Sequence, residues 1–322
     1  MKAVRIHEFG GPEVMQYEEV PTPTPGAGQV LVKLAASGLN FIDVYQRTGL
    51  YPNDLPYGLG LEGSGTVAAV GAEVSELGEG DPVAYTGVPG SYAEYVLAPV
   101  DRLVRMPDGL DVKVGAAAML QGMTAHYLAY TTYPLKAGDT CLIHAAAGGV
   151  GLILVQMAKQ CGARVIGTVS TEEKAALARE AGADEIILYT QQDFETEVKR
   201  LTEGKGVQVI YDSVAKDTFD KGLNCLAPLG YMVLYGQSSG PIPPFDPAIL
   251  NAKGSLFLTR PSLFHYIADR ASLEKRAGDV LGWIASGALK LRMEHTFALS
   301  DVAEAHRSLE GRKTTGKVLL IP

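Results

Sequence analysis

The sequence predicts an α/β protein in which an all-β region of about 120 residues precedes a doubly wound parallel sheet of six strands. Three observations lead to this prediction. Short segments in the first region alternate apolar with polar residues. Beyond residue 125, helical stretches alternate with short apolar strands. A glycine-rich turn at residues 148–151 joins a strand to a helix.

The first region reads as a series of short strands. The amino-terminal residues 1–6 alternate in this way, as do residues 29–34, 65–70 and 92–96. Turn residues separate them at 21–28, 58–65 and 78–81. Many short strands with turns at such spacing predict a barrel or a sandwich. We expect this domain to span residues 1–124.

The second region has the pattern of a dinucleotide-binding domain, which we place at residues 125–261. We predict helices at residues 149–161, 172–182, 193–203 and 217–226, and strands at 140–145, 163–169, 185–189, 207–214, 230–236 and 254–260. Six strands alternating with helices match the two halves of the doubly wound fold. The proline-rich segment 241–247 cannot join a ladder and is expected to be a surface loop.

The remaining residues, 262–322, are too few for a further domain. They contain a long helical segment at 262–286, a helix near 300–310 and a final strand at 316–320. We expect this tail to pack on the first domain and complete it.

The glycine turn predicts a nucleotide site. It follows the apolar strand 140–143 and precedes the apolar helix 152–158. We align Ala146, Gly148 and Gly151 with the three glycines of the fingerprint G-x-G-x-x-G. A helix N-terminus carries unpaired N–H groups, and a turn without side chains lets a pyrophosphate reach them. A plain strand–helix turn has the same local pattern.

The end of the second strand of this domain favours NADPH over NADH. NAD sites place Asp or Glu there to hold the ribose 2′-OH, but this chain has Ser170. Lys174 lies one turn into the next helix, where its ammonium group would meet a 2′-phosphate. Two alternatives stay open. Lys174 can be a solvated side chain behind the N-cap Thr171, and Glu172 can bend back to a 2′-OH, which would reverse the preference.

Composition excludes several other classes. The net charge is −8 with no block of basic residues, which argues against a general nucleic-acid binder. No apolar run reaches the length of a membrane span, and no signal peptide is evident, so we expect a cytoplasmic protein. Three cysteines without a neighbouring partner do not form a disulfide framework, and Cys141 in an apolar strand is expected to be a buried thiol.

Five segments together resemble one family. They are residues 38–43 (GLNFID), 60–65 (GLEGSG), 145–151 (AAAGGVG), 234–240 (LYGQSSG) and 259–262 (TRPS). Across essentially its whole length the chain resembles the zinc-independent quinone oxidoreductases of the medium-chain dehydrogenase/reductase superfamily, the group that includes zeta-crystallin. The resemblance implies a GroES-like β-barrel catalytic domain, completed by the tail, and a Rossmann domain, with the active site in the cleft between the domains.

The resemblance also bears on metals. The zinc-dependent branch carries Cys at the position of Asn40 and His at the position of Leu61, and both ligands are missing here. Asn40, Asp43 and Glu62 would offer only oxygen and amide groups, whereas Zn²⁺ prefers His and Cys. We therefore expect no catalytic zinc.

Candidate site residues follow from matching positions. Asn40, Tyr45 and Tyr51 are the expected donors to an acceptor oxygen and are our catalytic candidates. Asp43 is expected to hold Tyr45 or a backbone turn. The resemblance implies that NADPH contacts Phe41, Ile42, Asp43, Thr124 and Tyr127 at the nicotinamide end, Gly148, Gly149 and Val150 at the pyrophosphate, and Ser170, Lys174, Tyr189 and Arg312 at the 2′-phosphate. Ser213, Tyr235, Gly236, Ser238, Leu258 and Thr259 would line the rest of the groove.

The implied reaction is NADPH-dependent reduction of a quinone, an acceptor reactive enough to need no Lewis acid. One alternative is reduction of α,β-unsaturated ketones or thioesters, which would use the same fold and cofactor. Another is a non-catalytic protein that binds NADPH or RNA, although the charge of −8 disfavours RNA. The sixth strand, 254–260, would be an apolar edge unless paired, which favours a homodimer through it.

Overall fold

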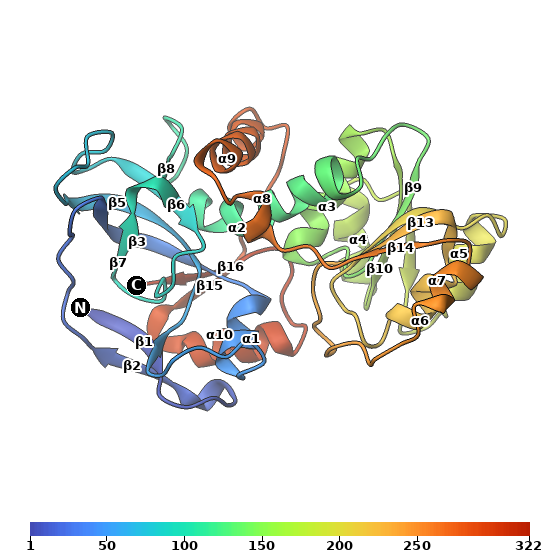
Figure 1. Ribbon diagram of the computed structural model, residues 1–322, viewed down its shortest axis with the longest axis horizontal. Coiled ribbons are helices and arrows are strands. Elements are labelled where there is room, and N and C mark those ends of the chain that lie inside the picture. Colours follow the sequence, from blue (N-terminus) through green and yellow to red (C-terminus); the bar gives the residue numbers. More distant parts are fainter. The chain divides into compact units, whose positions relative to one another are not determined.

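The computed structural model describes all 322 residues and divides into two compact units. The first unit comprises Met1–Met123 and Ile267–Pro322, and the second comprises Thr124–Tyr266. In Figure 1 the first unit therefore combines the amino-terminal part of the chain, coloured blue to green, with the carboxyl-terminal part, coloured orange to red. No helix is both long and apolar enough to cross a bilayer.

The first unit is built on two sheets. A seven-stranded sheet has the order β15-β16-β3-β5-β6-β8, with β7 also paired to β3, and a three-stranded sheet has the order β2-β1-β4. The strands are β1 (Lys2–Ile6), β2 (Met15–Glu19), β3 (Gln29–Leu39), β4 (Tyr57–Gly58), β5 (Glu62–Val70), β6 (Pro82–Thr86), β7 (Tyr95–Pro99), β8 (Val104–Arg105), β15 (His295–Ala298) and β16 (Val318–Ile321).

The carboxyl-terminal strand joins the amino-terminal sheet directly. β16 runs antiparallel to β3, with Val318 opposite Leu39 and Leu320 opposite Ser37. Both strands contribute to one apolar core, in which Leu39, Val318 and Leu320 are almost fully buried. The start of β16 is therefore held next to the end of β3 and the residues that follow it.

Two helices interrupt the region that the sequence predicts to be all β, so that prediction was wrong there. They are α1 (Phe41–Arg47) and the start of α2 (Lys113–Tyr127). α1 is only seven residues long, too short for a clear helical period. α2 contains three consecutive alanines and is buried on nearly all sides, so no polar face marks its period.

The prediction of one long helix at 262–286 was also wrong, because the segment forms two separate helices. α8 (Leu263–Tyr266) ends before α9 (Arg270–Ala285) begins. The Asp269 carboxylate accepts a hydrogen bond from the backbone N–H of Ser272 and so caps α9. The predicted helix near the end of the chain is α10 (Val302–Glu310). Short turns of 3-10 helix lie at Pro12–Val14, Val100–Arg102 and Leu299–Asp301, and a π-helical turn lies at Leu128–Thr132.

The second unit confirms the predicted doubly wound sheet. Its six strands are parallel and have the order β11-β10-β9-β12-β13-β14. The strands are β9 (Thr140–Ile143), β10 (Arg164–Val169), β11 (Glu185–Leu188), β12 (Val207–Asp212), β13 (Leu226–Leu234) and β14 (Phe257–Thr259). The helices between them are α3 (Gly149–Gln160), α4 (Glu172–Glu180), α5 (Phe194–Leu201), α6 (Phe219–Leu223) and α7 (Ala248–Ala252).

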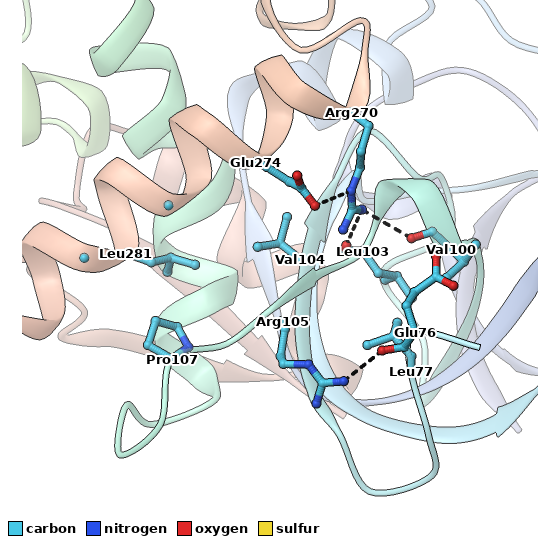
Figure 2. Close-up of a pocket in the computed structure, with 12 residues that line it drawn as sticks. Glu76, Leu77, Val100, Leu103, Val104, Arg105, Pro107, Arg270, Glu274 and Leu281 are labelled. Atoms are coloured by element: carbon cyan, nitrogen blue, oxygen red, sulfur yellow. Dashed lines mark hydrogen bonds and ion pairs between the residues drawn. The ribbon is translucent and has the colours of Figure 1, made fainter. Parts of the chain in front are cut away.

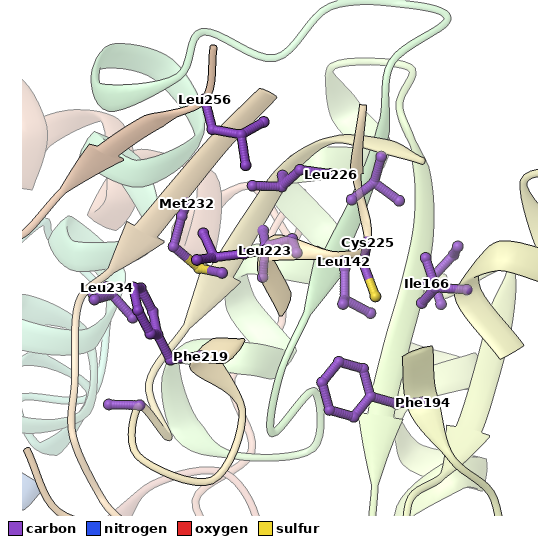
Figure 3. Close-up of a cluster of buried hydrophobic side chains, with 14 of the residues drawn as sticks. Leu142, Ile166, Phe194, Phe219, Leu223, Cys225, Leu226, Met232, Leu234 and Leu256 are labelled. Atoms are coloured by element: carbon purple, nitrogen blue, oxygen red, sulfur yellow. The ribbon is translucent and has the colours of Figure 1, made fainter. Parts of the chain in front are cut away.

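The core of this unit explains why the strands are recognisable in the sequence. Leu142, Ile166 and Met232 come from three different strands and are fully or almost fully excluded from solvent. Phe194 and Phe219, from two helices, cover them on one face of the sheet (Figure 3). Strands covered on both faces read as unbroken apolar runs.

Candidate active site

The glycine turn of the second unit presents an uncapped helix N-terminus. α3 begins at Gly149 after the N-cap Gly148, and no side chain caps it. The turn is pinned by the N–H of Ala146, which donates to the carbonyl of Thr168 at 3.1 Å. A Cβ at Gly151 would lie 2.3 Å from the Ala145 carbonyl oxygen, so only glycine permits this packing. The first N–H groups of α3 are thus available to an anion such as a pyrophosphate.

Three predicted residues lie just beyond the ends of β10 and β11. Ser170 directly follows β10 and Tyr189 directly follows β11, and the N–H of Tyr189 donates to the Val169 carbonyl at 3.1 Å. Lys174 lies in the first turn of α4, where its N–H donates to the hydroxyl of Thr171. A cation, two hydroxyl groups and the start of a helix are a suitable set for a phosphate.

The ends of β12 and β13 bring four further predicted residues together. Ser213 follows β12, and its carbonyl accepts a hydrogen bond from the N–H of Ser238 at 3.0 Å. Tyr235 follows β13 and donates its N–H to the backbone carbonyl of Asp212 at 2.9 Å. A Cβ at Gly236 would lie 2.7 Å from the Ser213 carbonyl oxygen. Leu258 and Thr259 lie in β14, which pairs with β13.

Asp212 organises this edge and was missed in the sequence analysis. Its buried carboxylate accepts hydrogen bonds from the N–H groups of Val214 and Ala215 at 2.7 and 3.0 Å. The Thr218 hydroxyl donates to the other oxygen at 2.7 Å. The signal was present in the sequence, because a lone acidic residue ending an apolar strand needs partners when it is buried.

Thr124 and Tyr127 lie near the carboxyl end of α2 and are buried. The ring of Tyr127 stacks on that of Tyr266, with centroids 4.2 Å apart and planes 9° apart. Burial, together with the nearby phenols of Tyr235 and Tyr266, raises the pKa of Tyr127. Its phenol is therefore a neutral hydrogen-bond donor at physiological pH.

In the first unit, the helix α1 gathers the predicted residues 40–45. Asn40 is its N-cap, and the Asp43 carboxylate accepts the backbone N–H of Asn40 at 2.8 Å. The ring of Tyr45 meets that of Tyr51 edge-on at 5.3 Å and that of Phe41 at 6.2 Å. The N–H of Tyr51 donates to the Tyr45 carbonyl at 3.0 Å. Ile42 belongs to the same first turn.

Asp43 holds a backbone turn, as one of the two sequence interpretations has it. The hydroxyl group that it binds belongs to Tyr92, at 2.8 Å, rather than to Tyr45. Burial raises the pKa of Asp43 to about 7, against the lowering effects of the Asn40 N–H and the Tyr92 hydroxyl.

The side chain of Asn40 belongs to a buried polar cluster, of which the sequence analysis grouped Glu62 with Asn40 but missed Gln121 and Lys317. Its amide contacts the side chains of Glu62, Gln121 and Lys317. Lys317 comes from just before β16, at the far end of the chain. In the sequence it is a single lysine before an apolar strand, and nothing local indicates burial. The structure has no group of three or more His, Cys, Asp or Glu side chains placed to hold a metal ion.

Arg312 lies in the first unit, in the turn between α10 and β16. Its φ is 58°, in the left-handed region. The N–H of Arg312 donates to the Leu309 carbonyl at 3.1 Å, which fixes the turn.

A separate pocket of the first unit contains none of the predicted residues. It has a volume of about 420 Å³ and lies between α9 and the segment around β8 (Figure 2). Its two arginines are occupied. Arg270 donates to Glu274 at 2.7 Å and to the Leu103 carbonyl at 2.6 Å, and Arg105 donates to the Glu76 carbonyl at 2.9 Å. We therefore do not assign the active site to this pocket.

Family models place the chain in a general class. Residues 26–108 match the alcohol dehydrogenase GroES-like domain, and residues 149–272 match the domain described as zinc-binding dehydrogenase. The chain thus has the domain pair of a medium-chain dehydrogenase/reductase.

Individual relatives narrow the class. A quinone oxidoreductase of Pseudomonas aeruginosa is 46% identical over 100% of this chain and 99% of that protein. A 2-haloacrylate reductase of a Burkholderia species is 42% identical over 99% of this chain and 98% of that protein. The crystal structure of Escherichia coli quinone oxidoreductase complexed with NADPH has a TM-score of 0.98 and 42% identity, covering 100% of both chains. The chain belongs to the zeta-crystallin-like quinone oxidoreductase family.

Proposed function

We propose that this protein reduces quinones with NADPH. The observation that carries the cofactor assignment is the uncapped glycine turn before α3, together with a 2′-phosphate corner that has Lys174 and no acidic residue at the end of β10. The Escherichia coli relative that is complexed with NADPH supports it. Three relatives that are quinone oxidoreductases support a quinone as the acceptor.

The uncapped glycine turn before α3 fits the pyrophosphate of NADPH. Gly148, Gly149 and Val150 would hold the pyrophosphate through backbone N–H groups. We propose Ser170, Lys174, Tyr189 and Arg312 for the 2′-phosphate. We propose Ser213, Tyr235, Gly236, Ser238, Leu258 and Thr259 for the middle of the cofactor, and Thr124, Tyr127, Phe41, Ile42 and Asp43 for the nicotinamide end.

For the acceptor we propose Asn40, Tyr45 and Tyr51 as the site residues. NADPH, when bound, supplies a hydride, and one proton from solvent completes the conversion of a quinone to a hydroquinone. The hydroxyl groups of Tyr45 and Tyr51 would donate hydrogen bonds to the acceptor oxygen on which negative charge develops. Phe41 and Ile42, beside them on α1, would exclude water from the reacting atoms.

A rate comparison tests this proposal. Purified protein is given NADPH with 1,4-benzoquinone in one assay and with crotonyl thioester in another, and NADPH oxidation is followed. We expect faster turnover with the quinone. The 42% identity to a 2-haloacrylate reductase favours reduction of an activated double bond as the second candidate function. Faster turnover of the thioester would establish that second function instead.

We also propose a cytoplasmic homodimer formed through β14. Phe257 of this edge strand is 47% exposed, and its ring stacks on that of Tyr231 at 4.6 Å. Leu229, two residues before Tyr231 in the sequence, is 62% exposed. An apolar sheet edge of this kind is stabilised by pairing with a second copy. Light scattering at micromolar concentration should give twice the chain mass, and a monomer mass would refute the dimer.

A further inference from the structure

The amide of Asn40 has no hydrogen left to give to an acceptor. Its Nδ2 donates to the Gly38 carbonyl at 3.1 Å and to Glu62 Oε2 at 2.8 Å. Its Oδ1 accepts from Gln121 Nε2 at 3.2 Å and from Lys317 Nζ at 2.9 Å. An asparagine amide has two donor hydrogens and two acceptor lone pairs. All four are used within the first unit.

Two of the partners of Asn40, Glu62 and Lys317, form an ion pair that is almost completely buried. The side chains of Lys317 and Glu62 are 2% and 0% exposed, and the ammonium group contacts Glu62 Oε2 directly. The other oxygen of Glu62 accepts the backbone N–H of Leu120 at 2.6 Å. A Cβ at Gly38 would lie 2.5 Å from Glu62 Oε2 and 2.6 Å from Lys317 Nζ. The backbone thus leaves space for the pair only because residue 38 is glycine.

Such a pair is costly to build. Two charges lose their hydration when they are buried, and apolar replacements are often at least as stable. Its retention needs a reason besides stability. The geometry supplies one, because the ammonium group fixes Oδ1 of Asn40 while the carboxylate fixes Nδ2, and the amide then has a single orientation.

We propose that Lys317 is a positioning residue for the reaction and acts through Asn40. With Glu62 it locks the Asn40 amide at the start of α1, the helix that carries Tyr45. This inference rests on the proposed function in placing α1 at the acceptor. In this arrangement Tyr45 and Tyr51 donate the hydrogen bonds to the acceptor. Asn40 donates none and instead provides a rigid surface beside the acceptor. Hydride transfer is sensitive to small errors in the placement of the reacting atoms, so a mobile Asn40 side chain lowers kcat.

A double-mutant cycle tests the coupling. Lys317→Met is made in the wild-type protein and in Asn40→Ala, and kcat and the Kd of NADPH are measured for all four proteins. We expect kcat to fall about tenfold in the wild-type background, with the Kd of NADPH changed less than about twofold, and no further fall in the Asn40→Ala background. An equal fall in both backgrounds overturns the proposal, and so does an unchanged kcat.

The control and a second variant keep the test decisive. Lys275→Met removes an exposed lysine of α9 that pairs with Asp279, and kcat should not change. Lys317→Met leaves the buried charge of Glu62 unpaired. If the variant protein is then too unstable to fold, the charge-balanced double substitution Lys317→Met with Glu62→Gln replaces it in both backgrounds.

Hydrogen exchange gives a readout that does not depend on activity. Amides of the segment 40–48 should exchange faster when Lys317 is replaced, and unchanged protection there overturns the proposal. If the wild-type protein reduces no quinone, the proposed function fails, whereas the exchange result still decides whether Lys317 fixes Asn40.

Discussion

At the scale of single residues, buried side chains of the first unit form a directed chain of hydrogen bonds. The Arg47 guanidinium can only donate, so Nδ1 of His306 accepts from it at 3.0 Å. Nε2 of the neutral ring then carries the hydrogen and faces the Tyr92 hydroxyl at 3.3 Å, and Tyr92 donates to Asp43. Glu310 accepts from Arg47 at 2.8 and 2.9 Å at the outer end.

This series of buried hydrogen bonds predicts an unusual dependence of stability on pH. Burial, with the Arg47 charge, lowers the pKa of His306 to about 3, so its contribution is present above pH 6.5 and is lost as the pH falls toward 3. The raised pKa of Asp43 works in the opposite direction. That contribution is present below about pH 4 and is lost as the pH rises toward 7.

His306→Gln separates the two contributions. Its cost in unfolding free energy should grow by about 2 kcal/mol as the pH rises from about 4.5 to 6.5, and it should level off above that. Chemical denaturation of both proteins at several pH values measures this difference. A cost that is the same at all pH values would show that His306 is not held neutral in the folded protein.

Lys174 gives a second prediction at the residue scale. If its ammonium group meets the 2′-phosphate, Lys174→Ala should weaken NADPH binding about tenfold and leave NADH binding nearly unchanged. Titration of both cofactors by fluorescence checks this. Equal losses for the two cofactors would rule out a phosphate contact at Lys174.

At the scale of elements, local chemistry decided what the sequence could reveal. The strands β9 and β12 were predictable because they are short apolar runs next to glycine or polar turns. α1 and α2 were not, since one is very short and the other has no polar face. The break before α9 depends on the Asp269 cap, a single-residue signal inside an otherwise continuous helical pattern.

The glycine turn provides the prediction at this scale. Gly151→Ala places a Cβ 2.3 Å from the Ala145 carbonyl oxygen, so the start of α3 must shift. NADPH affinity should fall at least tenfold, and the protein should lose roughly 1–3 kcal/mol of stability. Gly282→Ala in α9 is a matched control, because its Cβ meets nothing within 4 Å. It should leave affinity unchanged and raise stability by up to about 1 kcal/mol. Equal effects of both substitutions would contradict the role given to the turn.

At the scale of the whole molecule, the sequence predicted the nucleotide-binding unit better than the unit with α1. The ends of parallel strands meet at one edge of a sheet, so Ser170 and the glycine turn can be grouped from the strand pattern, while Tyr189 and Ser213 are implied by the family resemblance. The cluster around Asn40 depends instead on β16 pairing with β3, which brings Lys317 to residue 40. No local pattern reports a contact across 277 residues.

We propose that the glycine turn and the corner at Lys174 select NADPH as the reductant of a quinone. Parallel measurements of kcat/KM for NADPH and NADH, with 1,4-benzoquinone as the acceptor, test it most directly. We predict that NADPH is preferred at least about tenfold, as expected for a charge-assisted contact to the 2′-phosphate. Equal values for the two cofactors, or a preference for NADH, would contradict this account.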